Sequence, residues 1–332
     1  MCIRDRRQTA LRGEREDTRP LAALEAATQS RRLVLLGDPG GGKSTFVRQL
    51  LAWLAARQLG EGQPLPEDMA PQMGDLLPVL VTLRDLAPRL QTRDWEALPA
   101  GKPRGALARL VRDQALADLE RLDAEGFAAG LDQALADGRC FLVFDGLDEA
   151  PPALRRWVRQ AIQAAIGQYA PPRVIVTCRV RSYSGEAELP RFDAHTLAPF
   201  DPDQVRAFVA AWYAAQCDLG RVDAVESREK TADLQGAALA PDLRELSANP
   251  MLLTTMAIIH QRDVGLPKEK VRLYHQAVTL LLHRWQRHRG VRASKALAAV
   301  LADELKMRTI MERLAHDAHQ REAVSYTHLR AH

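Results

Sequence analysis

Short apolar runs alternate with longer amphipathic segments over the first two thirds of the chain. Four runs, at 33–36, 79–83, 141–144 and 174–177, are almost entirely apolar and predict central β-strands. Strands that are apolar on both faces are typical of a parallel sheet covered on both sides. The pattern therefore predicts an α/β fold, a three-layer α/β/α parallel sheet with crossover helices between the strands.

The segments between these runs predict helices. After the sequence PPAL at 151–154, apolar residues recur with a period of 3.6 and form a stripe that should pack on the sheet. The stripe consists of Leu154, Trp157, Val158, Ala161, Ile162 and Ala165. Pro- and Gly-rich stretches at 60–78 and 98–105 are predicted to be loops.

After about residue 200 the sequence predicts helices alone. Asp201 is a predicted N-cap, and the segment that follows carries apolar residues on one helical face. These residues are Val205, Phe208, Val209 and Trp212. Similar patterns at 249–260 and 271–285 predict further helices, so a second, all-α domain is expected to begin near residue 201.

Composition excludes several classes of protein. The longest apolar runs, at 50–56 and 251–259, are far shorter than the roughly 18 residues that predict a membrane span. The four cysteines, Cys2, Cys140, Cys178 and Cys217, show no metal-ligand spacing, which indicates neither a zinc site nor a disulfide framework and suits a reducing cytoplasm. A net charge of +4 is too small to indicate a partner.

A glycine-rich loop follows the first predicted strand. The sequence GDPGGGKST at 37–45 fits the pattern GxxxxGK[ST] between a strand and a helix. Glycines let backbone amides curl around phosphate oxygens, and the start of the helix adds positive charge. The residues predicted to hold the nucleotide are Gly37, Asp38, Pro39, Gly40, Gly41, Gly42, Lys43, Ser44 and Thr45. Lys43 is expected to reach the β- and γ-phosphates, and Ser44 to ligate Mg²⁺.

Three carboxylates follow the third predicted strand, in the sequence FLVFDGLDEA at 141–150. Asp145 is predicted to hold Mg²⁺, because an aspartate at the end of a neighbouring strand has this role in phosphate-binding folds of this type. Gly146 stands where many such ATPases have a second acid, and it would let the chain turn so that Asp148 and Glu149 approach the phosphate. Asp148 is the first choice for orienting the attacking water, with Glu149 second. The alternative is that these two acids cap the next helix.

With these motifs in place, the chain resembles the NACHT-type members of the STAND class of P-loop NTPases. The segments 78–86 and 174–179 are similar to the second and fourth strands of that family. The resemblance implies that Arg179 is the sensor arginine that reads the γ-phosphate; its alternative is an ion pair with Asp145 or Asp148. It also implies that Pro250, in a helical segment like that of the family, lies against the nucleotide base; from the residues alone, Pro250 could simply start a helix. Arg84 beside Asp85 is either a partner of the site or a surface pair.

The resemblance implies a switch that binds ATP or ADP with Mg²⁺, hydrolyses ATP slowly and controls self-oligomerisation and an attached effector. It also suggests a role in antiphage defence. Such proteins normally use a histidine of a winged-helix module to contact the diphosphate, but that module is expected to be missing or truncated here, so His316 and His319 receive no role.

The sequence leaves two other functions open. A DNA-associated AAA+-like ATPase would use a basic cluster at 284–292, although Trp285 continues the apolar stripe of Val278, Leu281 and Leu282 and favours the exposed face of a core helix. The cluster consists of Arg284, Arg287, His288, Arg289 and Arg292. A catalytically inactive nucleotide-binding scaffold is the other alternative.

The expected domain division has five parts. They are a flanking segment at 1–19, the P-loop domain at 20–200, the helical domain at 201–292, the start of a truncated winged-helix-like module at 293–322 and a tail at 323–332. The sequences MCIRDR and SYTHLRAH at the two ends resemble translated sequencing-adaptor read-through. Neither end is expected to contribute to the fold, and the natural protein is expected to continue in both directions.

Overall fold

The computed structural model describes residues 2–5, 21–61, 73, 75–91, 95, 102–262, 266, 272–279 and 303–329. The chain divides into two compact units, Met1–Ala257 and Ile258–His332, which are described separately. The first unit contains the sheet and the glycine-rich loop.

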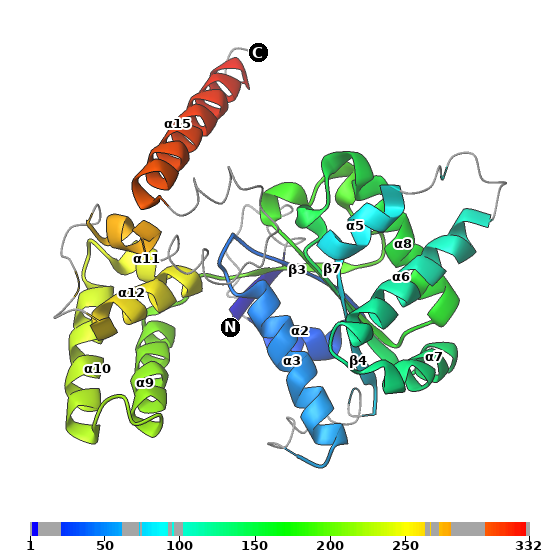
Figure 1. Ribbon diagram of the computed structural model, residues 1–332, viewed down its shortest axis with the longest axis horizontal. Helices are drawn as coiled ribbons and strands as arrows, with labels where there is room; N and C mark the ends of the chain where they lie inside the picture. Colours follow the sequence, from blue (N-terminus) through cyan, green and yellow to red (C-terminus); the bar gives the residue numbers. More distant parts are fainter. Residues whose placement is uncertain are drawn as a thin grey trace, which may run out of the picture. The chain divides into compact units, whose positions relative to one another are not determined.

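The first unit is built on a seven-stranded sheet in the order β2-β1-β7-β3-β6-β5-β4 (Figure 1). Its parallel strands are β3 (Arg32–Leu36), β4 (Leu77–Thr82), β5 (Cys140–Asp145), β6 (Arg173–Cys178) and β7 (Asp193–Leu197). Two short strands, β1 (Cys2–Asp5) and β2 (Leu21–Ala22), extend the sheet beyond β7 in antiparallel orientation. The four predicted strands and their parallel arrangement are confirmed.

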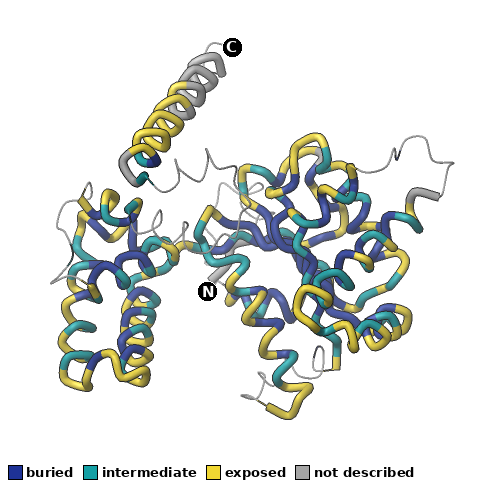
Figure 2. Tube along the Cα trace, viewed as in Figure 1, coloured by how far each residue is buried: buried dark blue, intermediate teal, exposed yellow. Residues whose placement is uncertain are grey.

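Helices cover both faces of the sheet, because alternate residues of each strand point to opposite sides. On one face, α2 (Ala23–Gln29) and α3 (Lys43–Gln58) pack against residues such as Leu33 and Leu35 of β3. On the other, α5 (Leu83–Gln91), α6 (Lys102–Glu120), α7 (Ala128–Ala136) and α8 (Arg155–Tyr169) pack against residues such as Val34 and Leu36. The buried strands lie between these helical layers (Figure 2). The fold is thus the predicted three-layer α/β/α arrangement.

The structure differs from the sequence prediction in three places within the sheet domain. β7 was not predicted, because the sequence DAHTL is half polar and three of its five residues are not buried. β4 was expected in the centre but lies at the edge of the sheet, where only alternate residues are buried. Leu83 begins α5 instead of ending the strand.

The predicted loop at 98–105 is wrong for Lys102 to Gly105, which form the first turn of α6. Pro103 fits there because the first turn of a helix does not need its N–H group. The remaining residues of this stretch, and most of the predicted loop at 60–78, lie outside the described part of the chain.

Described residues between 201 and 257 contain helices and the turns that join them. The helices are α9 (Pro202–Asp218), α10 (Ala224–Leu239), α11 (Arg244–Ser247) and α12 (Pro250–Arg262). The predicted cap is confirmed, since the Asp201 carboxylate accepts from Gln204 N and Gln204 reaches back to Asp201 N. Val205 and Val209 are buried as predicted, together with Tyr213.

In the second unit, the structure describes a helix at 272–279 and α15 (Glu304–Leu329). The first of these buries Leu273 and Ala277, whereas Val278 is 46% exposed. The prediction that Val278 belongs to the buried stripe is therefore wrong, because the buried face of this helix is rotated toward Leu273. The basic cluster at 284–292, Trp285, Leu281 and Leu282 lie outside the described residues. His316 lies beside Asp317 on exposed α15.

Both terminal sequences contribute to secondary structure, contrary to expectation. Cys2–Asp5 pairs with β7 through backbone hydrogen bonds, which an exposed strand edge offers to almost any sequence. α15 continues to Leu329, through residues expected to lie outside the fold, because helix propagation depends on backbone bonds more than on an apolar pattern. Within the described residues, no helix combines the length and the apolar character needed to cross a bilayer.

Candidate functional site

The glycine-rich loop connects β3 to α3 at the carboxyl end of the parallel strands. Gly42 is the N-cap of α3 with φ +89°, and no side chain caps the helix. The first backbone N–H groups of α3, including that of Thr45, are therefore available to an anion, and the helix dipole favours one there. This strand, loop and helix on a parallel sheet between two helical layers constitute a P-loop NTPase fold.

Gly40 is required by its backbone and by its surroundings. Its φ of +72° is a left-handed conformation, and an added Cβ would lie 2.7 Å from Met251 Cβ. The loop is also closed internally, since Gly41 N donates to Asp38 O over 3.0 Å. The glycines therefore allow a tight loop that a distant helix can approach.

Lys43 folds back across the loop. Its Nζ donates to Gly37 O at 2.7 Å and to Asp38 O at 3.0 Å. Burial lowers the pKa of Lys43, an effect that the negative charge of Asp148 opposes and the positive charge of Arg179 supports. The ammonium group thus lies in the same electrostatic environment as both of these residues.

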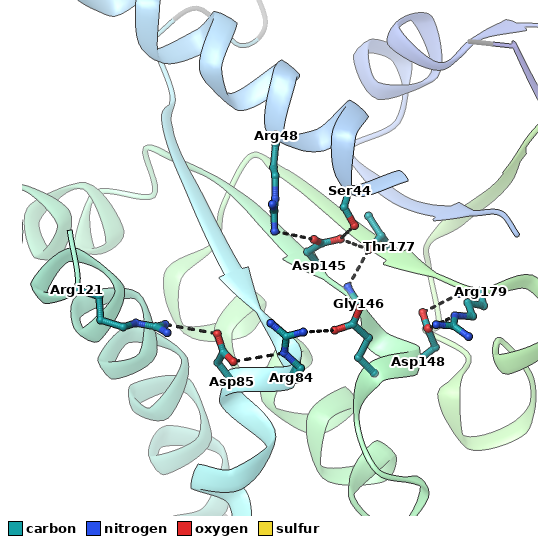
Figure 3. A network of polar contacts seen from close by, with 11 residues as sticks. Ser44, Arg48, Arg84, Asp85, Arg121, Asp145, Gly146, Asp148, Thr177 and Arg179 are labelled. Carbon is teal, nitrogen blue, oxygen red and sulfur yellow. Dashed lines mark hydrogen bonds and ion pairs between the residues drawn. The ribbon is translucent and has the colours of Figure 1, made fainter. Parts of the chain in front are cut away.

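Ser44 and Asp145 meet where α3 begins and β5 ends. Ser44 Oγ donates to Asp145 Oδ1 over 2.9 Å, joining residues 101 positions apart. The Asp145 side chain is 8% exposed, and Arg48 Nη2 lies 3.9 Å from its Oδ2 (Figure 3). A hydroxyl and a carboxylate so placed are oxygen ligands of the kind that Mg²⁺ prefers, with phosphate and water completing the shell. The described residues contain no cluster of three His, Cys, Asp or Glu side chains that could hold a metal without such additions.

Gly146 turns the chain after Asp145, as predicted. Its φ is +85°, and Leu147–Glu149 form a short 3₁₀ turn. An added Cβ at Gly146 would meet the Glu149 side chain at 3.1 Å. The turn brings Asp148 back toward the end of β6.

Asp148 forms a two-point contact with Arg179. Asp148 Oδ1 accepts from Arg179 N at 2.9 Å, and Arg179 Nε lies 2.8 Å from Asp148 Oδ2 (Figure 3). The ion pair considered for Arg179 therefore exists, with Asp148 as its partner. The Asp148 side chain is 7% exposed, so this pair is well shielded on its acidic side. Burial, reinforced by Asp148, raises the pKa of the neighbouring Cys178 thiol to about 12, which keeps it neutral.

Glu149 belongs to a chain of ion pairs that leads away from the loop. Arg84 Nη1 lies 3.7 Å from Glu149 Oε2, and Arg84 Nε lies 3.7 Å from Asp85 Oδ1. Arg121, directly after α6, joins Asp85 at 3.5 Å and also contacts Asp118. Both alternatives given for Arg84 therefore hold. It contacts Glu149 of the acidic turn, and it forms a surface pair with Asp85.

The alternative that the acids cap the next helix is wrong. α8 begins at Arg155 with Leu154 as its N-cap and has no side-chain cap. Both carboxylates are instead directed to arginines, Asp148 to Arg179 and Glu149 to Arg84.

The start of α12 contacts the tip of the glycine-rich loop. Asn249 Nδ2 donates to Pro39 O at 3.0 Å, and Met251 N donates to Gly40 O at 3.2 Å. Pro250 is the first residue of α12, between these two contacts. The helical segment is therefore connected directly to the loop.

The structure places four predicted features at the carboxyl ends of the parallel strands. These are the glycine-rich loop, Asp145, Asp148 and Arg179. Sequence reasoning missed Arg48, Thr177 and Asn249 as members of this group. Thr177 is the last residue of the predicted strand and precedes Cys178. Its Oγ1 donates to Asp145 Oδ1 at 2.6 Å. A polar residue at the end of an otherwise apolar strand was the signal that could have identified it.

A scan against models of protein families found no match, and a search of curated proteins found none either. Among solved structures, the chain is similar to C. elegans PCH-2, with 12% identity and a TM-score of 0.39, over 77% of this chain and 61% of that one. It is also similar to domain III of the Thermotoga maritima replication initiation protein DnaA, with 13% identity and a TM-score of 0.36, over 78% of this chain and 88% of that one. The chain thus spans about three fifths of the length of the PCH-2 chain.

Proposed function

We propose that this chain binds ATP or ADP together with Mg²⁺ and hydrolyses ATP slowly, as a nucleotide-dependent signalling switch. The observation that carries the proposal is the hydrogen bond between Ser44 and Asp145 at the start of the helix that follows the glycine-rich loop. It joins the hydroxyl of the proposed phosphate-binding motif to a shielded carboxylate at the end of β5. This pairing is the oxygen environment that a Mg²⁺-nucleotide requires.

In this proposal, the backbone amides of 37–45 hold the phosphates and Lys43 reaches the β- and γ-phosphates. Ser44 and Asp145 hold Mg²⁺, which neutralises phosphate charge when bound. Arg48 contributes positive charge beside Asp145 Oδ2. The lowered pKa of Lys43 supports its role, because a partly desolvated ammonium gains most from an anionic partner.

For hydrolysis, Asp148 remains the first choice for orienting water, with Glu149 second. Asp148 Oδ1 contacts Arg179 N and Oδ2 contacts Arg179 Nε, so departure of the Arg179 side chain would leave Oδ2 open to a water molecule. Arg179 would then be free to reach the γ-phosphate, as expected of a sensor arginine. If Arg179 moves from Asp148 to the γ-phosphate, recognition of the γ-phosphate would be coupled to activation of the water by Asp148.

The switch part of the proposal rests on the resemblance to NACHT-type STAND proteins and on the contacts of α12. Asn249 and Met251 connect the helical segment to Pro39 and Gly40. A change in the loop on nucleotide binding would therefore alter these hydrogen bonds and shift the start of α12. Pro250 is proposed to lie against the base. We further propose that the nucleotide state controls self-oligomerisation and an effector, in antiphage defence.

Calorimetric titration of Lys43→Ala with Mg²⁺-ATP and Mg²⁺-ADP tests the site. Loss of the ammonium should weaken binding by about tenfold to a hundredfold, corresponding to a charged hydrogen bond of roughly 1.5–3 kcal/mol. Lys230→Ala is the matched control, because Lys230 pairs with Glu226 on the helix surface of α10. Unchanged affinity in Lys43→Ala would refute the whole assignment.

Two further measurements test the switch. Single-turnover hydrolysis of ATP separates a slow enzyme from an inactive scaffold. Light scattering with ATP, with ADP and without nucleotide should show a larger mass with ATP, and an identical mass in all three conditions would contradict nucleotide-controlled oligomerisation.

A further inference from the structure

Thr177 is a buried residue of β6 and contacts the end of β5. Asp145 ends β5, and the predicted sensor residue Arg179 follows β6. Thr177 precedes the last residue of β6 and is 1% exposed. Its Oγ1 is 2.6 Å from Asp145 Oδ1, and Gly146 N is 2.8 Å from Oγ1 (Figure 3). A single hydroxyl thus contacts the proposed metal ligand and the glycine that starts the turn.

The direction of both hydrogen bonds is determined by chemistry. A backbone N–H can only donate, so Thr177 Oγ1 accepts from Gly146. The one hydroxyl proton is then free for the Asp145 carboxylate, which can only accept while it is ionised. The Thr177 hydroxyl is therefore held at both ends and has a fixed orientation.

This contact constrains the Asp145 carboxylate. Oδ1 receives hydrogen bonds from both Thr177 and Ser44, whereas Oδ2 faces Arg48. Two donors on one oxygen fix the rotation of the carboxylate, and the donor from β6 comes from the better buried of the two residues. A carboxylate so held does not have to be reoriented when it takes up a cation.

Thr177 also continues the pairing of β5 and β6 beyond their backbone ladder. The register ends at Phe144 opposite Val176. The next contacts are made by side chains, Thr177 to Asp145 and Gly146, followed by Asp148 to Arg179. The turn that carries Asp148 is therefore attached at two points, to Thr177 in β6 and to Arg179 directly after β6.

We propose that Thr177 is a positioning residue of the metal site. It orients Asp145 for Mg²⁺ and holds the turn at Gly146, and it does not itself contact the nucleotide. This inference rests on the proposed function, because it concerns how the site takes up Mg²⁺ with a nucleotide.

The test compares Thr177→Val with Thr177→Ser. Valine keeps the shape of the side chain but has no hydroxyl, whereas serine keeps the hydroxyl. Mg²⁺ is titrated in calorimetry at a fixed ADP concentration, and ADP affinity is measured separately in a chelator. The Mg²⁺ concentration for half-maximal enhancement of binding should rise about 10- to 100-fold in Thr177→Val, as expected for loss of an outer-shell partner, and stay near the original value in Thr177→Ser. Affinity in chelator should be the same in all variants.

Thr28→Val is the matched control. Thr28 is 4% exposed in α2 and donates to Leu24 O, so this variant also loses a buried hydroxyl hydrogen bond. Its Mg²⁺ dependence should be that of the original protein, and a shift equal to that of Thr177→Val would refute the proposal.

If Thr177→Val does not fold, Thr177→Ala is compared with Thr177→Ser, because both lack the methyl group of threonine and only alanine also lacks the hydroxyl. Equal Mg²⁺ dependence in these two variants, or an unshifted Thr177→Val, would overturn the inference. Failure of the unmodified chain to bind Mg²⁺-ADP would instead refute the proposed function, so the two failures are distinguishable.

Discussion

The side-chain amide of Asn249 donates a 3.0 Å hydrogen bond to the carbonyl oxygen of Pro39, across 210 positions of sequence. The same side chain caps α12, since its Oδ1 accepts from Met251 N and Leu252 N. Asn249 thus joins the start of a helix to the tip of the glycine-rich loop. The NH₂ group of the amide binds the loop and its oxygen caps the helix, so substitutions can separate these two functions.

Asn249→Asp should weaken nucleotide binding with little effect on stability. Aspartate keeps the oxygen that caps α12 but replaces the amide donor to Pro39 with negative charge near the proposed phosphates. We expect an affinity loss of about tenfold in calorimetry, because the new negative charge repels the phosphates. The free energy of unfolding should stay within about 0.5 kcal/mol of the original, because a charged cap at the start of α12 offsets the lost hydrogen bond to Pro39. Asp223→Ala removes the equivalent cap of α10 and should cost about 1 kcal/mol of stability without changing affinity. Wild-type affinity in Asn249→Asp would contradict the coupling.

Gly40→Ala should destabilise the protein by more than about 1 kcal/mol. The left-handed φ at Gly40 disfavours any side chain, and the new Cβ would clash with Met251. Denaturant unfolding measures the loss. The double variant with Met251→Ala should still carry the backbone cost, because removing Met251 atoms beyond Cβ leaves both φ and the 2.7 Å Cβ contact unchanged.

Gly236→Ala is the comparison for Gly40→Ala. Gly236 lies within α10 and a Cβ there would meet nothing within 4 Å. This substitution should stabilise the chain by about 0.5–1 kcal/mol. Equal effects of the two glycine substitutions would show that Gly40 is not constrained.

Asp148→Asn should retain nucleotide binding and lose hydrolysis. The amide cannot act as a base and keeps only part of the contact with Arg179, so single-turnover rates should fall by about 100-fold or more. Asp203→Asn, on the exposed first turn of α9, is the control and should hydrolyse normally. If the rate of Asp148→Asn is unchanged, the role passes to Glu149 or another residue, and Glu149→Gln decides between these outcomes.

Nucleotide affinity should fall at alkaline pH because of Lys43. Burial lowers the pKa of Lys43 in the free protein, and bound phosphates would raise it in the complex. Nucleotide binding is then strongest at pH values below the pKa of Lys43 in the free protein. Between that pKa and the higher pKa of Lys43 in the complex, affinity falls by up to about tenfold per pH unit. Calorimetry in buffers of different ionisation enthalpy should detect proton uptake in this range.

Lys43→Arg is the control for the pH experiment, since a guanidinium remains charged throughout. Its affinity should be independent of pH over the same range, whatever its absolute value. An equal fall of affinity in Lys43→Arg would assign the pH dependence to another group.

The elements predicted well were those defined by local patterns. Apolar runs identified β3, β5 and β6, because a strand buried on both faces favours apolar residues at most of its positions. The turn at Gly146 was also predictable, since glycine readily adopts its left-handed conformation. β7 escaped prediction because its pattern is mixed and its place in the sheet comes from backbone pairing with β3 and β1.

The sequence by itself therefore determined a parallel α/β fold, the glycine-rich loop after β3 and the acids that follow β5. Only the tertiary structure decided which partner each polar or charged group has. Arg179 pairs with Asp148, Arg84 with Glu149, and Asn249 with Pro39. The physical reason is range: a hydrogen bond needs its atoms within about 3 Å, and only the folded chain brings such distant residues that close.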